Sequence, residues 1–164
     1  GLYGQPAIDE LASQTVNLLN SRAVESQVFP LQLAFNMQPV APCQDIPAQL
    51  QQLLQAPGLE CSVQAMVTAS FFGLAIAVSL QSDSEIDRDR LESRLQQTSG
   101  IKLVNEAASP LTHCKEGSDL LINYLQQPQN DTNRLQFWIL ADAVRNGLIQ
   151  NYQNILEILL KFHL

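Results

Sequence analysis

The stretch from Leu59 to Leu80 constrains the fold most, because its hydrophobic pattern changes halfway along. From Leu59 to Ala69, apolar or small residues alternate with mostly polar ones, and a period of two places the two sets on opposite faces of a strand. Gly73 interrupts the run, and from Leu74 onward nearly every residue is apolar or small. The pattern predicts two neighbouring strands that pair, the second one central and covered on both faces.

Three other segments carry the signals of helices. Apolar residues near the N-terminus recur at the spacing of one helix face, namely Ile8, Leu11, Ala12, Thr15 and Leu19. Pro47 suits a first helical turn, and the helix that it begins is expected to end before Pro57. Ser84 and Asp87 have the spacing of a capping box, so a helix should begin there and end at Gly100.

The remaining strands are expected in shorter pieces. A segment with a proline near each end should pair only in its middle, Leu31–Phe35, as an edge strand. Ile101–Val104 is expected to be a short strand, followed by an irregular loop over residues 105–118. The strand-like runs Asp119–Gln126 and Arg134–Leu140 flank a turn-rich segment and therefore predict a hairpin.

A final helix over residues 148–162 completes the predicted elements. Its apolar residues spread over roughly 200° of the helical wheel, at about 100° per residue, which is more than one sheet face can cover. The 164 residues show no repeat and no linker. We therefore expect a single α+β domain over residues 1–164, with a mixed, largely antiparallel sheet and helices on one face.

Charge and cysteine content narrow the choice of partners and compartment. The net charge is −7 and only 15% of residues are charged, so the chain lacks a basic face for phosphates and nucleic acid is not an expected partner. The longest apolar run is too short and too interrupted for a membrane span, and the chain begins without a signal-peptide pattern. Three widely spaced cysteines are typical of free thiols in a reducing cytoplasm.

The residues with reactive side chains do not form a predicted catalytic or metal site. His113 and Cys114 adjoin in sequence, but a thiolate relay needs them in a cleft with a third orienting group. His163 stands where a cation complements the dipole at the end of the final helix, and a lone histidine is not expected to bind a metal. The mixed-sign run of residues 85–94 is typical of a solvated helix face.

Several short motifs, taken in order, resemble the C-terminal half of the aspartate-semialdehyde dehydrogenase family and most closely its Usg-like members. The motifs are Ile8-Asp9-Glu10-Leu11, Leu33-Ala34-Phe35-Asn36, Phe71-Phe72-Gly73, and Asp142-Ala143-Val144-Arg145-Asn146-Gly147 with Asn151. The resemblance implies the fold of the glyceraldehyde-3-phosphate dehydrogenase-like C-terminal domain. It also implies that a nucleotide-binding domain lies upstream, so that NAD(P) would belong to that domain and no cofactor to this chain.

The same resemblance implies where the family's chemistry would lie. In that family an arginine holds the substrate carboxylate and a histidine seven residues later acts as the general base. Alignment on Phe71-Phe72-Gly73 places Val67 and Leu74 there, and neither side chain can clamp a carboxylate or transfer a proton. The other vestigial family positions are Asn36, Asp142, Arg145 and Asn151. We therefore expect this chain to have no catalytic site and to act in dimerisation and partner binding.

The expected homodimer would use the more polar side of the predicted Leu59–Ala69 strand. That side consists of Ser62, Gln64, Met66 and Thr68. A sheet with helices on one side leaves its other face bare, which is an aggregation liability in water. A two-fold pairing removes the liability with one self-complementary patch.

Two alternatives stay open. One is an enzyme in amino-acid biosynthesis that uses other residues, with an upstream domain that supplies the nucleophilic cysteine and NAD or NADP. The other is a structural subunit that pairs with an active paralogue. The coding region upstream of Gly1 would distinguish the first, and co-purification would distinguish the second.

Overall fold

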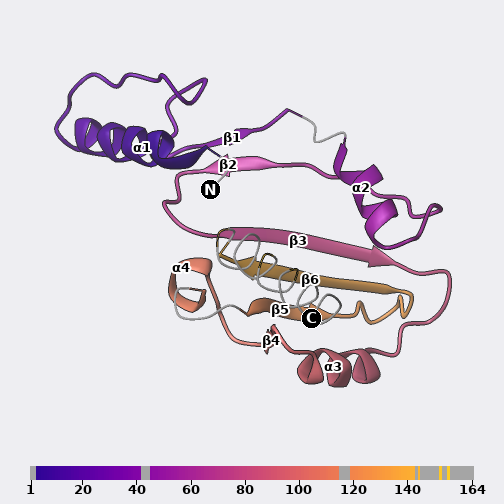
Figure 1. The fold of residues 1–164 in the computed structure, drawn as a ribbon. Coiled ribbons are helices and arrows are strands. Elements are labelled where there is room, and N and C mark those ends of the chain that lie inside the picture. Colours follow the sequence, from indigo (N-terminus) through magenta and orange to yellow (C-terminus); the bar gives the residue numbers. More distant parts are fainter. Residues whose placement is uncertain are drawn as a thin grey trace, which may run out of the picture. The chain divides into compact units, whose positions relative to one another are not determined.

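A computed structural model describes residues 3–41, 45–114, 119–142, 144, 152 and 155. The chain divides into two compact units, residues 2–71 and residues 72–164, and each is described by itself (Figure 1). In the part of the chain that the structure describes, no helix has both the length and the apolar character needed to cross a membrane. The predicted final helix lies almost entirely outside the described residues, and the single domain stays a prediction.

The unit of residues 2–71 contains two helices and a small antiparallel sheet. Its elements are α1 (Gly4–Leu19), β1 (Met37–Pro39), α2 (Asp45–Leu53) and β2 (Met66–Thr68). β1 pairs with β2, and Gln38 lies opposite Val67. The predicted strand at Leu31–Phe35 is wrong, because Phe35 adopts a positive φ of 59° that breaks an extended conformation.

The buried face of α1 differs from the predicted one. Leu11 and Gln14 are buried at 3% and 1% exposure, whereas Ala12 is exposed and Leu19 is 73% exposed. The core beside α1 consists of Ala7, Leu11, Phe29, Leu33 and Ala34. The helix was predicted correctly, but its orientation was not, because a polar residue lies at the centre of its buried face.

Gln14 is buried because the loop after α1 satisfies its side-chain amide. Its Oε1 accepts hydrogen bonds from the backbone N–H groups of Leu33 at 2.8 Å and Ala34 at 3.1 Å. Its Nε2 donates to the Glu25 carbonyl and to Ser26 Oγ, both at 3.1 Å. A buried polar group with such partners carries little penalty, so Gln14 holds the loop against the helix.

Glu10, one turn earlier on α1, holds the same loop by its charge. Its carboxylate accepts hydrogen bonds from the backbone N–H groups of Gln27, Val28 and Phe29 at 2.9, 2.6 and 3.2 Å. Burial raises the pKa of Glu10, but the three backbone donors together outweigh it and the pKa is lowered overall. The carboxylate is therefore ionised in the folded protein.

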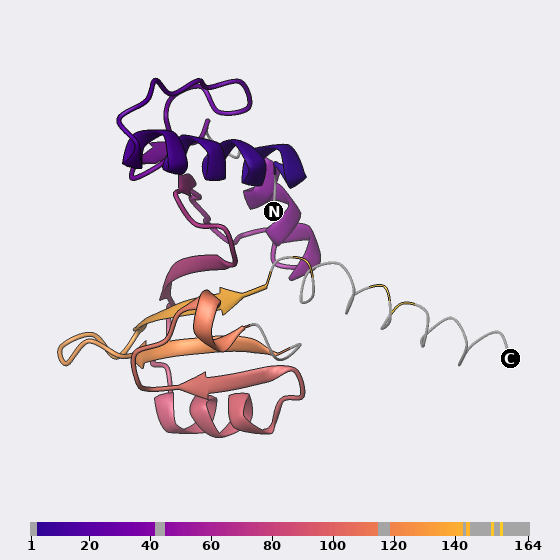
Figure 2. The ribbon, with the colours of Figure 1, turned by 90° about the vertical axis from the view of Figure 1, so that its left-hand side faces the viewer.

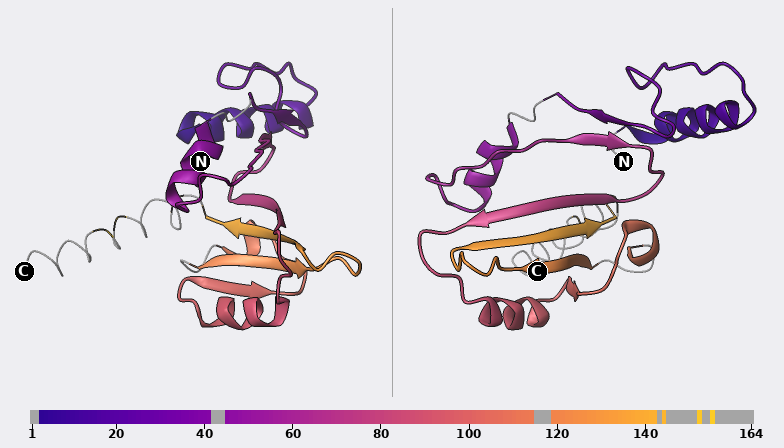
Figure 3. Two further views of the ribbon diagram at one scale, coloured as in Figure 1. Left: turned by 90° about the vertical axis from the view of Figure 1, so that its right-hand side faces the viewer. Right: turned by 180° about the vertical axis from the view of Figure 1, so that it is seen from behind.

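The unit of residues 72–164 is built on a four-stranded sheet. Its elements are β3 (Leu74–Gln81), α3 (Arg88–Gln97), β4 (Ile101–Val104), α4 (Pro110–His113), β5 (Leu120–Gln126) and β6 (Arg134–Ala141). The strand order is β3-β6-β5-β4, with β4 and β5 parallel and the other two pairs antiparallel (Figures 1 and 3). The predicted α+β fold, its mixed sheet and its β5–β6 hairpin are confirmed.

Helix α3 packs against one face of this sheet (Figure 2). Leu91 and Leu95 point inward, as predicted, and contact the cluster of Ile122, Leu125 and Leu135. The opposite face buries another cluster, made of Val104, Cys114, Leu121 and Leu140, next to the short α4. Side chains alternate between faces along β5 and β6, so both faces of the two inner strands are packed.

The predicted capping box does not form. Asp87 caps α3, and its Oδ1 accepts the backbone N–H of Arg90 at 2.9 Å. The backbone N–H of Ile86 instead donates to the Thr132 carbonyl at 2.9 Å, which ties the segment before the helix to the β5–β6 hairpin. The helix therefore begins at Arg88, after this long-range contact.

Strand β3 is not the covered central strand that its sequence predicted. Among the described residues it pairs with β6 alone and forms one edge of the sheet, while β2 pairs with β1. Leu74, Ile76 and Leu80 are 40%, 42% and 43% exposed. Gly73 separates the two predicted strands with a φ of +90°, a conformation that ends an extended run.

Replacing Gly73 by alanine should destabilise the unit of residues 72–164. A Cβ at Gly73 would lie 2.0 Å from Pro110 Cβ, and φ is positive there, so we expect a loss of about 2–4 kcal/mol from strain and overlap. Gly100 has a φ of +81° with no atom within 4 Å of the added Cβ. Gly100→Ala should therefore lose only about 1 kcal/mol. Urea unfolding measures both, and equal losses would contradict the close contact with Pro110.

Replacing Glu10 by glutamine should lower stability in a pH-dependent way. Because its pKa is lowered in the folded state, the carboxylate stabilises the protein above its ordinary pKa of 4.5 and loses this effect as pH falls through the folded-state value. We expect Glu10→Gln to lose about 1–2 kcal/mol at neutral pH, and little in acid. Glu25→Gln, an equal charge change at an exposed side chain, should change stability little at either pH in the same unfolding measurements.

Candidate functional site

The start of β3 is anchored to α4. Gly73 lies directly against Pro110, the first residue of that helix. Ser109 caps α4, since its Oγ accepts the backbone N–H of Thr112 at 3.4 Å. The sequence predicted only an irregular loop here. The missed signal was the serine followed by proline, which is a usual beginning of a helix.

Asn123 on β5 fixes the segment that leads to α4. Its side chain is 3% exposed, and its Nδ2 donates to the Val104 carbonyl at 2.6 Å and to the Glu106 carbonyl at 2.9 Å. Sequence reasoning did not single it out. The available signal was one amide within the otherwise apolar strand Leu120–Leu125.

His113 and Cys114 do not form a thiolate relay. Burial raises the pKa of the Cys114 thiol, and the negative charge of Asp142 raises it further. The thiol therefore stays protonated and is a poor nucleophile at neutral pH. The imidazole of His113 is exposed, and its Nδ1 accepts from the backbone N–H of Ser109 at 3.2 Å. Cys114 thus packs in the core cluster next to α4, and His113 stabilises the turn at the start of α4.

Two of the positions that the sequence analysis assigned to the family's site lie close together at one end of the β3–β6 pair. Leu74 lies opposite Ala141, and Asp142 follows directly. Asp142 is 7% exposed, and its Oδ1 accepts the backbone N–H of Val144 at 2.9 Å. Its carboxylate therefore holds the turn after β6. Arg145 and Asn151 lie outside the described residues.

Two further positions assigned to the family's site lie in the unit of residues 2–71. Val67 on β2 is partly buried and packs against the core beside α1. Asn36 precedes β1 and stabilises its own turn, with Nδ2 donating to the Gln32 carbonyl at 3.1 Å and Oδ1 accepting the Met37 N–H at 2.9 Å. Neither arrangement has the form of a carboxylate clamp.

The predicted dimer residues of this unit lie on one exposed side of the chain. Ser62, Gln64, Met66 and Thr68 are exposed, whereas the residues between them are partly buried. The period-two pattern thus extends over residues 61–68, although only Met66–Thr68 forms a strand.

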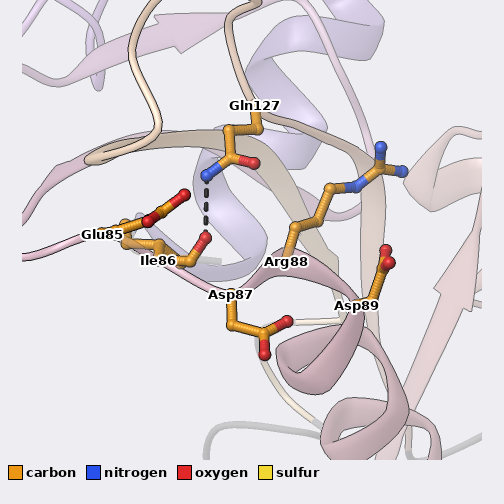
Figure 4. A pocket seen from close by; sticks show the side chains of 6 residues that line it. All are labelled: Glu85, Ile86, Asp87, Arg88, Asp89 and Gln127. Carbon is orange, nitrogen blue, oxygen red and sulfur yellow. Dashed lines mark hydrogen bonds between the residues drawn. The ribbon is translucent and has the colours of Figure 1, made fainter.

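An open pocket of about 590 Å³ lies between the start of α3 and the β5–β6 hairpin (Figure 4). It is lined by Glu85, Ile86, Asp87, Arg88, Asp89 and Gln127. Gln127 Nε2 donates to the Ile86 carbonyl at 2.9 Å and to the Thr132 carbonyl at 2.7 Å, and Asp87 caps the helix. These polar groups connect the hairpin to α3. Within the described ranges, no three histidine, cysteine or acidic side chains gather closely enough to hold a metal ion.

Comparison with known proteins identifies the relatives of this chain, although no family model matches it. The USG-1 protein homolog of Azotobacter vinelandii is 28% identical over 170 residues, which are 96% of this chain and 51% of the relative. Aspartate-semialdehyde dehydrogenase 2 of Vibrio cholerae is 29% identical over 171 residues, which are 96% of this chain and 50% of the relative. The chain spans about half the length of the curated relatives it matches.

Solved structures agree with these sequence matches. Aspartate semialdehyde dehydrogenase II of Vibrio cholerae, in complex with ASA, superposes with a TM-score of 0.89 at 26% identity, over 98% of this chain and 51% of that one. A probable aspartate-semialdehyde dehydrogenase of Pseudomonas aeruginosa superposes with a TM-score of 0.87 at 28% identity, over 96% of this chain and 51% of that one. The chain is therefore a homologue of aspartate-semialdehyde dehydrogenase that corresponds to about half of it, the C-terminal part.

Proposed function

We propose that this chain is a self-associating, partner-binding domain without catalytic activity of its own. The exposure of apolar side chains along β3 and β6 carries the proposal. Leu74, Ile76, Leu80 and Trp138 are 40%, 42%, 43% and 45% exposed. Large apolar side chains exposed on two neighbouring strands are typical of an interaction site.

These side chains lie on both faces of the sheet. Leu74, Ile76 and Leu80 alternate along β3 and share one face, while Trp138 lies opposite Ala77 and belongs to the other face. Helix α3 packs mainly against β4, β5 and β6, and the cluster of Val104, Cys114, Leu121 and Leu140 next to α4 involves the same three strands. Within the described residues of this unit, the exposed apolar side chains of β3 lie outside these two clusters, and association would cover them.

The identity of two residues supports the absence of catalysis. By the family alignment, Val67 and Leu74 occupy the positions of the arginine that binds substrate and of the histidine base. Val67 packs against a core, and Leu74 contributes to the exposed apolar strip. Neither can stabilise a carboxylate or move a proton.

A second candidate is one part of an NAD(P)-dependent semialdehyde dehydrogenase in which an upstream domain supplies the cofactor and the nucleophile. The relatives named aspartate-semialdehyde dehydrogenase favour it, because the match reaches only half of their length. Assay of the natural protein, with any upstream domain present, distinguishes the two. Reduction of NADP by an aldehyde substrate that depends on a residue of this chain would favour the second candidate.

Restoring the two family side chains should not create an enzyme. Val67→Arg places a charge against an apolar core and should destabilise the unit of residues 2–71 by about 2–4 kcal/mol. Leu74→His is at an exposed position and should lose less than about 1 kcal/mol. We expect the double variant and the parent chain to show no semialdehyde oxidation with NAD or NADP. Turnover by the parent chain that a substitution within it abolishes would contradict the proposal.

Light scattering at micromolar concentration tests self-association. We expect a mass near twice 18.2 kDa. The Gln64→Glu, Met66→Glu variant tests whether the exposed side of residues 62–68 takes part, and there we expect a shift toward the mass of one chain, because like charges would meet across a two-fold axis. Gln49→Glu with Gln52→Glu adds the same charge at exposed positions on α2 and should leave the mass unchanged. A mass near 18.2 kDa at every concentration would exclude self-association.

A further inference from the structure

We propose that residues 2–71 open and close as one cooperative unit while residues 72–142 stay folded. Opening here means that α1 separates from the loop of residues 20–36 and that the core between them is lost. The inference goes beyond the proposed self-association and does not depend on it, because it rests on the core and the hydrogen bonds of each unit taken by itself.

Each unit has a hydrophobic core built from its own residues. In the unit of residues 2–71 this core is one cluster of five buried residues, two of which are the small Ala7 and Ala34. In the unit of residues 72–164, two clusters lie on opposite faces of the sheet and hold four and three buried residues. A segment with a core of its own can open as a separate cooperative element.

The sheets of the two units differ in the stability that they can supply. β1 and β2 pair over three residues each, and a two-stranded ladder is marginally stable in water unless other elements pack against it. The sheet of the other unit has four strands, of which β3 and β6 pair over eight residues. We therefore expect residues 2–71 to be the less stable of the two units.

The unit of residues 2–71 is closed by contacts between α1 and the loop that follows it. Glu10 and Gln14 accept hydrogen bonds from five backbone N–H groups of that loop. The ring of Tyr3 lies edge-on against Phe29, with the ring centroids 5.5 Å apart. All residues of α2 are described, and none of them is buried. Because the closing contacts share one helix, their loss removes the core at once, and we expect the opening to be all-or-none.

A unit of low stability joined to a stable one is suited to control by a partner. Segments that move or become ordered on binding are drawn from the low-stability part of a protein. A partner that binds only the closed form of residues 2–71 would shift the equilibrium by its difference in affinity for the two forms. The four-stranded sheet would keep its structure throughout.

Amide hydrogen exchange in the whole chain, followed residue by residue, tests the proposal. Gln14→Ala leaves the buried N–H groups of Leu33 and Ala34 without their acceptor. Exchange of the α1 amides should become at least about tenfold faster, while the amides of β5 and β6 keep their parent rates.

Asn123→Ala is the matched control, because Asn123 is also a buried amide that binds two backbone groups. It should speed exchange in β5 and β6 and leave the α1 amides at their parent rates. Faster exchange in both units from either variant, or unchanged α1 exchange in Gln14→Ala, would overturn the proposal.

Urea unfolding of the parent chain gives a second measurement that needs no substitution. Trp138 is the single tryptophan of the chain and lies on β6, so its fluorescence follows the unit of residues 72–142. Far-UV circular dichroism also follows α1, which has 16 residues and is the longest of the described helices. The ellipticity should begin to change at a lower urea concentration than the fluorescence. Coincident transitions would show a single cooperative unit and exclude the proposal.

Discussion

The register between β3 and β6 determines which side chains of β3 lie on each face of the sheet in the unit of residues 72–164. Eight residue pairs run from Leu74 opposite Ala141 to Gln81 opposite Arg134, where Arg134 Nε donates to Gln81 Oε1 at 3.0 Å. Because side chains alternate along a strand, this register assigns every residue of β3 to a face. A shift of β3 by one residue would exchange the two sets and move Leu74, Ile76 and Leu80 to the other face of the sheet.

Buried polar residues in both units hold backbone groups of the loops and strands around them. Gln14 and Asn123 each use their amides on main-chain groups, and Glu10 accepts three backbone N–H groups. Within the described part of the chain, no buried side-chain nitrogen or oxygen lacks a hydrogen-bond partner. These residues therefore use their hydrogen-bonding groups to fix the loops that they contact.

Local patterns predicted the elements better than their positions. The β5–β6 hairpin and the helix α3 follow from turn residues and helical spacing, which are properties of neighbouring residues. The capping box failed because Ile86 bonds to Thr132, far along the chain, and the edge strand failed because Phe35 has a positive φ. Gln14 was absent from the predicted buried face of the first helix because periodicity counts every amide as polar, whatever it contacts.

The candidate site shows a further limit of sequence reasoning. The positions of Val67 and Leu74 were identified from the neighbouring motif Phe71-Phe72-Gly73, since nothing in their own pattern marks them as parts of a site. By that alignment, each replaces a polar catalytic side chain with an apolar one. Val67 then extends a core, and Leu74 extends the exposed strip that continues through Ile76 and Leu80. Under the proposed function, the two replacements would also add apolar surface, at Val67 to the core of its own unit and at Leu74 to the strip proposed for association.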